Sequence, residues 1–185
     1  MKNPNAGLMI AQISPEKKDI EGNLIKDTSI ITELNQVENL FAADNHPPIF
    51  IEFYMNGCGP CQMTAPIWHT MIKIAKRKFA TTKLAIVSIE SKMMEQIKNN
   101  ALKSIAQTVK GFPTIGMIIN KKFIAYEGGR AAKLFISFIK KHLQHQNGGS
   151  LNIFKTLKKY GSRTRRSRRS RRSRNKNTHR RRRRS

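Results

Sequence analysis

Apolar residues recur along the chain with the spacings of strands and helices. The run Ile49–Tyr54 follows a double proline, is rich in β-branched and aromatic residues and is mostly apolar on both faces, as is typical of a buried central strand. Asn120-Lys121 separates two further apolar runs and predicts a two-residue hairpin turn. We therefore expect strands at Ser29–Leu34, Ile49–Tyr54, Leu84–Ile89, Thr114–Ile119 and Lys122–Tyr126.

Helical spacing occupies most of the intervals between these strands. The longest pattern opens at Pro60, a residue suited to a first helical turn, and places apolar residues three and four positions apart from Met63 to Ala75. Alternating strands and helices that end in a hairpin predict an α/β domain, with a mixed sheet covered by helices on both faces. The expected helices are Gln36–Ala43, the segment that begins at Pro60, Ser91–Val109 and Ala131–Leu143.

Charge divides the chain more sharply than hydropathy does. The 185 residues carry a net charge of +25, and residues 151–185 hold 17 Lys and Arg with no acid. The remaining 19 basic residues face all 11 acidic ones, so the rest of the chain carries +8. We therefore expect an arm at 1–28, which is either mobile or a loose extra strand, one domain at 29–145, a linker at 146–150 and a basic tail at 151–185.

The chain contains two cysteines, three positions apart, and no spread of pairs such as a secreted disulfide scaffold would have. The apolar patch near the N-terminus is shorter than the apolar region of a signal peptide. No apolar run is long enough for a membrane-spanning helix. These features favour an intracellular protein without a membrane partner.

The cysteines form the motif Cys58-Gly59-Pro60-Cys61 at the predicted start of a helix. Residues i and i+3 there face the same way, close enough for a disulfide. Unpaired N–H groups at the helix start stabilise a thiolate, which makes Cys58 the nucleophile and Cys61 the resolving thiol. A zinc site with His142 and His145 is an alternative, although these histidines are distant in the sequence. A second alternative is a pair of structural core cysteines.

Several motifs in order resemble the thioredoxin superfamily, including its protein disulfide isomerase domains. Phe53–Pro66 resembles the active-site stretch, and the residues from Glu52 to Tyr54 are closer to the isomerase domains. Gly111–Thr114 is similar to the cis-proline loop and Tyr126–Arg130 to the late glycine segment. The resemblance covers about Ser29 to Leu143 and implies the thioredoxin fold.

The resemblance implies roles for individual residues beside Cys58 and Cys61. Glu52 occupies the place of a buried carboxylate that relays the proton of the second cysteine, and burial would raise its pKa toward neutrality. The alternative is a glutamate that faces water. Pro113 would be the cis residue, and Pro66 would kink the helix. Client contacts are expected at Gly57, Gly59, Pro60 and Phe112.

Other positions either depart from the family pattern or belong to the core. Gly57 stands where the family usually has Trp, and Ile86 where thioredoxins often have a lysine. The stretch from Glu90 to Gly111 is longer than usual. Trp68 and the methionines around it are expected in the core rather than the site.

The tail repeats Arg-Arg-Ser and ends in an unbroken arginine run. Such a segment is expected to be disordered alone and to bind nucleic acid through phosphates, without sequence preference. Nuclear import is a second interpretation of the same run, and phosphorylation of its serines would weaken either role. The residues expected to bind nucleic acid are Arg165, Arg166, Arg168, Arg169, Arg171 and Arg172.

These features together predict a thiol–disulfide oxidoreductase without a cofactor or metal, whose partners are protein disulfide or dithiol clients and a thiol reductase or oxidase. The alternative function is a non-enzymatic nucleic-acid-binding or packaging protein that uses a thioredoxin-like scaffold. A redox domain with a nucleic-acid tail would also suit the particle of a large DNA virus.

Overall fold

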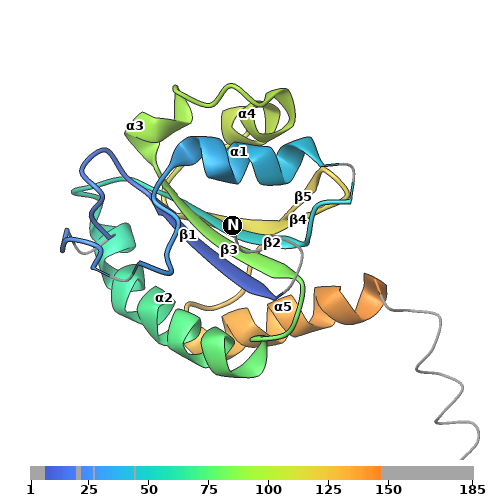
Figure 1. The fold of residues 1–185 in the computed structure, drawn as a ribbon. Helices are drawn as coiled ribbons and strands as arrows, with labels where there is room; N and C mark the ends of the chain where they lie inside the picture. Colours follow the sequence, from blue (N-terminus) through green and yellow to red (C-terminus); the bar gives the residue numbers. More distant parts are fainter. Residues whose placement is uncertain (1–6, 20–21, 27, 44, 147–185) are drawn as a thin grey trace, which may run out of the picture. The chain divides into compact units, whose positions relative to one another are not determined.

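The computed structural model describes residues 7–19, 22–26, 28–43 and 45–146. These residues form a mixed five-stranded sheet with helices on both faces, so the predicted fold class is confirmed (Figure 1). The elements in chain order are β1 (Leu8–Ile13), α1 (Leu34–Ala42), β2 (Ile49–Tyr54), α2 (Gly59–Lys78), β3 (Leu84–Glu90), α3 (Ser91–Met94), α4 (Asn100–Gln107), β4 (Thr114–Ile119), β5 (Lys122–Ala125) and α5 (Ala132–Gln146).

The strand order in the sheet is β1-β3-β2-β4-β5. β3 pairs in parallel with both β1 and β2, whereas β4 runs antiparallel to β2 and pairs with β5 as a hairpin. Asn120 and Lys121 connect the hairpin with φ angles of 50° and 62°, the positive values that a type I′ turn requires. The predicted hairpin is therefore confirmed.

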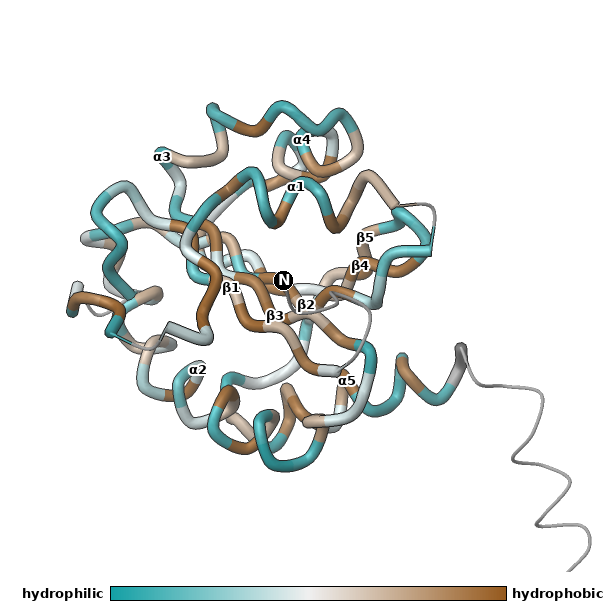
Figure 2. Tube along the Cα trace, viewed as in Figure 1, coloured by the Kyte–Doolittle hydropathy of each residue, from teal (hydrophilic) through white to brown (hydrophobic). Residues whose placement is uncertain are grey.

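Two apolar layers enclose the sheet. All six residues of β2 are buried, as predicted, and their side chains alternate between the two faces. Phe50 and Tyr54 pack in the cluster that contains the buried residues of α2 and α5, while Ile51 and Phe53 pack with α1 and α4. Figure 2 shows apolar positions concentrated along the strands, with hydrophilic positions on the outer sides of the helices.

The first strand lies earlier in the chain than predicted. Ser29–Leu34 was expected to be a strand, but only Ile31 in it makes a β-bridge, to Ala11. The strand is Leu8–Ile13, which pairs with β3 along its whole length and is mostly buried. The N-terminal segment was expected to be either a mobile arm or a loose extra strand. Its part Leu8–Ile13 is a strand of the sheet.

The segment expected to form one helix at Ser91–Val109 forms two. α3 ends at Met94, and Asn99 begins α4 by accepting hydrogen bonds from the backbone N–H groups of Ala101 and Leu102, at 3.0 and 3.1 Å. An Asn cap of this kind starts a new helix because it satisfies N–H groups that lack a partner within the helix.

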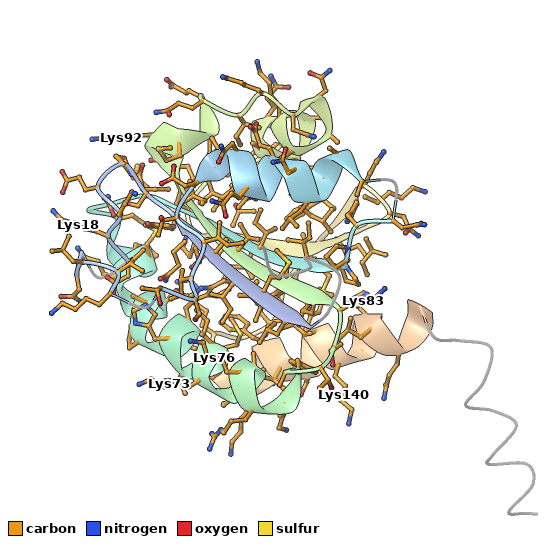
Figure 3. All side chains as sticks on the ribbon, in the orientation of Figure 1. Lys18, Lys73, Lys76, Lys83, Lys92 and Lys140 are labelled. Carbon is orange, nitrogen blue, oxygen red and sulfur yellow. A yellow bond between two sulfur atoms is a disulfide. The ribbon has the colours of Figure 1, made fainter. Side chains whose placement is uncertain are left out.

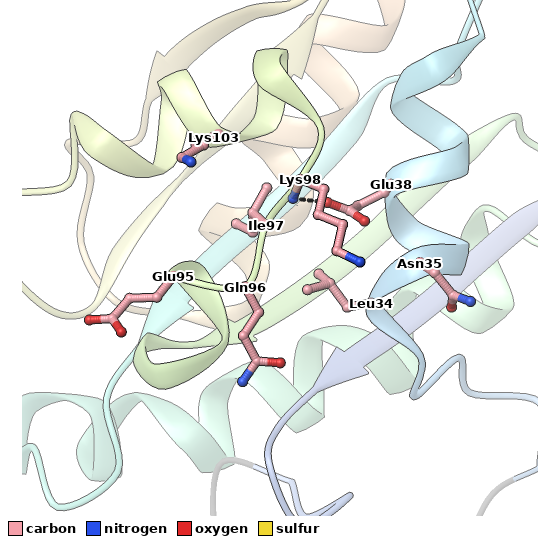
Figure 4. A pocket seen from close by; sticks show the side chains of 8 residues that line it. All are labelled: Leu34, Asn35, Glu38, Glu95, Gln96, Ile97, Lys98 and Lys103. Carbon is pink, nitrogen blue, oxygen red and sulfur yellow. Dashed lines mark hydrogen bonds between the residues drawn. The ribbon is translucent and has the colours of Figure 1, made fainter.

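Glu38 of α1 supports the same turn from the facing helix. Its carboxylate accepts the backbone N–H of Asn99 at 2.8 Å and also that of Lys98. A surface pocket opens here between α1 and the segment before α4 (Figure 4). The carboxylate of Glu38, which lines this pocket, is already occupied by the backbone N–H groups before α4. Its presence in the pocket is therefore explained by its structural role. The lining residues of the pocket are Leu34, Asn35, Glu38, Glu95, Gln96, Ile97, Lys98 and Lys103.

Residues 147–185 lie outside the described residues. They include most of the predicted linker and the whole predicted tail. The six arginines predicted to bind nucleic acid belong to this part. Among the helices that the structure describes, none is both long and apolar enough to cross a membrane.

Candidate active site

The cysteine pair lies where the chain passes from the end of β2 into the start of α2. Cys58 is the N-cap residue of α2, and Pro60 occupies the first turn of the helix. The two cysteines form a disulfide, with Cα atoms 5.2 Å apart. The backbone N–H of Cys61 points at the Cys58 sulfur, at an N–S distance of 3.3 Å. In the reduced protein this donor and the helix N-terminus favour a thiolate on Cys58.

The predicted cis-proline loop lies beside the cysteines. The Phe112–Pro113 peptide bond is cis, and the Phe112 carbonyl oxygen is 3.5 Å from the Cys58 sulfur. The sheet topology explains this proximity: β4 is antiparallel to β2 and pairs Thr114 with Phe53, so β4 begins where β2 ends. A loop that is distant in the sequence therefore borders the nucleophile.

The two sulfurs differ in their access to solvent. Cys58 is 9% exposed and Cys61 only 2%, so the first cysteine is the more accessible one. The chain before it is open, because Gly57 has a φ of 80° and a Cβ built there would meet no atom within 4 Å. A positive φ of this size is costly for residues with a side chain, so the glycine that replaces the usual Trp suits the local backbone.

Met55 and Met63 bring apolar surface to the neighbourhood of the cysteines. Met63 is 73% exposed and Met55 41%. The expectation that the methionines near Trp68 belong to the core is confirmed for Met71 and wrong for Met63, which lies on the solvent side of the first turns of α2. Trp68 itself is fully buried and stacks on Phe50 at 5.2 Å, as expected of a core residue.

Glu52 is fully buried, so the alternative of a glutamate that faces water is wrong. It lies on the same face of β2 as Phe50 and Tyr54, which share a cluster with both cysteines. Neither of its oxygens has a hydrogen-bond partner among the described residues. Burial raises the pKa of Glu52 to about 8, and the positive charge of Arg130 partly opposes the rise. The carboxyl group is therefore mostly protonated at neutral pH.

Glu52 belongs to a row of buried polar residues that sequence reasoning missed. Ser88 of β3 pairs with Glu52, and Gln12 of β1 pairs with Ser88, so the three residues sit side by side across three strands. All three are at most 4% exposed. The position of β3 that pairs with Glu52 thus holds a serine. Ile86 lies two residues earlier on β3 and pairs with Phe50.

Two charged residues near the cysteine loop were also missed. Arg130 donates to the Pro60 carbonyl oxygen at 3.4 Å, which links the turn before α5 to the first turn of α2. Glu90, at the end of β3, accepts the backbone N–H of Asn56 at 3.3 Å and that of Lys92 at 2.7 Å. Glu90 thus holds the loop before Cys58, and Arg130 holds the first turn of α2 after it. Asn56 and Glu90 are 34 residues apart and Pro60 and Arg130 are 70 apart, so spacing could not have revealed these two contacts.

The zinc alternative finds no support in the described contacts. His142 packs edge-on against Phe138, with ring centroids 4.5 Å apart, and the side chain of His145 lies outside the described part. Within the described ranges, no three His, Cys, Asp or Glu residues gather as a metal site would require.

Comparisons with known proteins agree with this architecture. The family model "Thioredoxin" matches residues 30–141. The chain is 30% identical over 97 residues to the "Thioredoxin domain-containing protein 5 homolog" of Drosophila melanogaster. The aligned region covers 52% of this chain and 22% of that protein. The chain is also 28% identical over 134 residues to "Protein disulfide-isomerase 1" of Caenorhabditis elegans, covering 72% and 24%. The chain thus spans under a quarter of the length of these two relatives.

Solved structures show a weaker likeness. The first thioredoxin domain of mouse Protein disulfide-isomerase A4 is 21% identical, with a TM-score of 0.45 over 59% of this chain and 71% of that one. Human ERp44 form II is 19% identical, with a TM-score of 0.47 over 59% and 28%. The family match spans more than half of the chain and includes both cysteines, Glu52 and Pro113. The chain belongs to the thioredoxin family.

Proposed function

We propose that the protein is a thiol–disulfide oxidoreductase that acts on disulfides or dithiols of other proteins. The observation that carries the proposal is the Cys58–Cys61 pair at the start of α2, with the more accessible sulfur beside the Phe112 carbonyl. The pair can take two electrons as a dithiol and return them as a disulfide. The family membership and the isomerase relatives support the same class of chemistry.

In the reducing direction, the Cys58 thiolate attacks one sulfur of a client disulfide, and the other client sulfur leaves as a thiolate. A mixed disulfide between Cys58 and the client results. Cys61 loses its proton and attacks the Cys58 sulfur, which releases the second client sulfur. The client gains two electrons and two protons, and the Cys58–Cys61 disulfide forms. A thiol reductant regenerates the dithiol, and the reverse sequence oxidises a client.

Glu52 is proposed as the group that takes the proton of Cys61. Its carboxyl group lies on the face of the sheet that carries the cysteine cluster. A pKa of about 8 lets the group accept and release a proton near neutral pH, which general acid–base catalysis requires. Because burial causes the shift, the carboxylate form is a strong acceptor inside the domain.

The client is proposed to bind across the cis-proline loop. The backbone of Phe112, immediately before Pro113, would pair with an extended client segment. Gly57, Gly59 and Pro60 would leave the approach to Cys58 uncrowded, since a Cβ on either glycine would meet nothing within 4 Å.

The test is reduction of insulin disulfides by the full chain with dithiothreitol as reductant. We expect Cys58→Ser to lower the rate at least about 1,000-fold, because the one other cysteine, Cys61, is only 2% exposed and cannot replace the nucleophile. Cys61→Ser should instead accumulate a covalent client adduct at Cys58, visible by mass spectrometry. Ser137→Ala, on the exposed side of α5, is the control and should match the unchanged chain. Equal rates for Cys58→Ser and the unchanged chain would refute the proposal.

For the tail we propose nucleic-acid binding, supported by its 17 basic residues without an acid. The virion and nuclear locations suggested by the sequence depend on this tail. Replacement of Arg165, Arg166, Arg168, Arg169, Arg171 and Arg172 by Gln should weaken binding to a DNA duplex and make it less salt-dependent. The packaging alternative predicts that Cys58→Ser leaves the protein's biological role intact, whereas the oxidoreductase proposal predicts its loss.

A further inference from the structure

The net positive charge of the domain is concentrated in two segments that pack on one face of the sheet. The segments 59–83 and 128–143 contain α2, the turn after it and most of α5, and they hold no Asp or Glu. They carry nine of the 19 basic residues that precede residue 151. The other ten basic residues face all 11 acids, so these two segments carry +9 and the remainder −1. We call their nine side chains the basic surface: Lys73, Lys76, Arg77, Lys78, Lys83, Arg130, Lys133, Lys140 and Lys141.

All nine side chains of the basic surface are exposed. Figure 3 shows Lys73 and Lys140 extending outward from α2 and α5. Both helices bury their apolar residues in the same cluster against the sheet, so their outer sides belong to one layer. On α2 the outward side is uncharged near the cysteines and becomes cationic only in the last turns, from Lys73 onward.

The concentration of like charge has a cost for the folded domain. Lys73 and Arg77 are spaced i, i+4, and Lys73 and Lys76 i, i+3, so they repel each other along the helix. Cations at the end of α2 also favour its C-terminus, which accounts for the last turn but not for Lys83 or the lysines of α5. A bound polyanion would relieve the repulsion on both helices.

We propose that the basic surface binds the phosphate backbone of nucleic acid. The choice of partner rests on the proposed role of the tail, which follows α5 in the chain and is also free of acids. Two cationic elements on one chain bind the same polymer more tightly than either does alone, because the second contact is intramolecular. The aromatic residues of α2 and α5 are buried or half-buried, so base stacking is not available and binding is independent of sequence.

The test compares two charge-matched triple variants of the full chain. Lys73→Gln, Lys83→Gln and Lys140→Gln remove three charges from the basic surface. Lys92→Gln, Lys98→Gln and Lys103→Gln remove three exposed charges from the α3–α4 side. Affinity for a fluorescent DNA duplex is measured over a series of salt concentrations. The slope of log K against log salt is negative, and each lost phosphate contact makes it less steep by about 0.9.

We expect the salt dependence of the basic-surface variant to be less steep, by an amount equal to about one to three phosphate contacts. The variant should also bind at least about tenfold more weakly. The α3–α4 variant should stay within about twofold of the unchanged chain. Lys73→Arg, Lys83→Arg and Lys140→Arg should restore binding, and circular dichroism confirms the fold of each variant. Both Gln variants should reduce insulin at the unchanged rate, because none of their residues borders the cysteines.

Equal slopes for the two Gln variants would overturn the inference and leave the tail as the binding element. An unchanged chain that does not bind the duplex even at low salt would refute the tail proposal and the inference together. Binding to phosphatidylserine vesicles that depends on the basic surface, without DNA binding, would overturn nucleic acid as the partner. None of these outcomes bears on the oxidoreductase proposal, which the cysteine variants test.

Discussion

The two faces of the sheet are built for different purposes. The α1–α4 face is packed with aliphatic and aromatic side chains such as Ile51, Phe53 and Phe41. The α2–α5 face contains the cysteines and a row of buried polar groups that includes Glu52 and Ser88. The α1–α4 face is therefore a mainly apolar core, whereas the other face accepts costly buried polar side chains next to the redox pair.

Charge follows the same division. The segments that form α2 and most of α5 carry only basic residues, although Asp19 from the N-terminal segment lies against His69 of α2, whereas the rest of the domain carries both acids and bases. The site, its buried carboxyl group and the basic surface thus share one side of the molecule. The sheet thus separates the residues that stabilise the fold from those of the site, and changes on its two faces should have separable effects.

The largest expected effect on stability comes from the apolar face. Ile51 is fully buried in the α1–α4 core, and Ile51→Ala should lower the free energy of unfolding by about 2–5 kcal/mol. The neighbouring Glu52 points to the other face, so the insulin-reduction rate of the folded variant should not change. Urea unfolding and the insulin assay measure the two quantities. A large loss of activity in the folded protein would break the proposed separation.

The second prediction concerns Glu52 and pH. Its pKa is raised from 4.5 to about 8 in the folded protein, so the folded state holds a proton that the unfolded state releases between these values. This contribution is complete below about pH 4.5 and is lost as the pH rises to about 8, at up to about 1.4 kcal/mol per pH unit.

Glu52→Gln removes that dependence, because the amide does not titrate. The variant should gain stability relative to the unchanged chain as the pH rises across this window, and the difference should level off above it. Urea unfolding of both oxidised proteins at several pH values gives the comparison. Parallel stability curves for the two proteins would contradict the assignment of a buried, protonated carboxyl group.

The smallest expected effect lies at the cap of α4. Asn99→Ala removes the side-chain oxygen that accepts two backbone N–H groups and should cost about 1 kcal/mol. Thermal unfolding measures the loss, with Asn100→Ala in the first turn as a neighbouring control. The reduction potential should stay constant, since α4 lies on the face away from the cysteines. A shifted potential would show that the two faces are coupled.

Local patterns predicted much of this fold. The strand β2 and the start of α2 were evident because prolines and continuous apolar runs mark them, and the site cysteines lie between them. β1 was predicted only as an alternative to a mobile arm, because its apolar run is short and Gln12 interrupts it. Its pairing with β3, more than seventy residues away, decides its conformation, and no local signal reports that pairing.

The site was predicted in its chemistry but not in its surroundings. Burial of Glu52 could be expected from an apolar strand, whereas its partner Ser88 depends on the register between β2 and β3. Arg130 reaches Pro60 across 70 residues, a contact that only the folded chain creates. Two helices replaced one at 91–109 because the turn depends on Glu38 in another element.

The reduction potential of the Cys58–Cys61 pair decides whether this pair is redox-active. The full chain is equilibrated with glutathione buffers, and the dithiol and disulfide forms are quantified after thiol trapping. We predict a reversible two-electron couple between about −270 mV, the value of thioredoxin, and about −180 mV, the value of protein disulfide isomerase. A potential near the lower value would assign the reducing direction and one near the upper value the oxidising direction. A pair without a reversible couple would contradict the redox function.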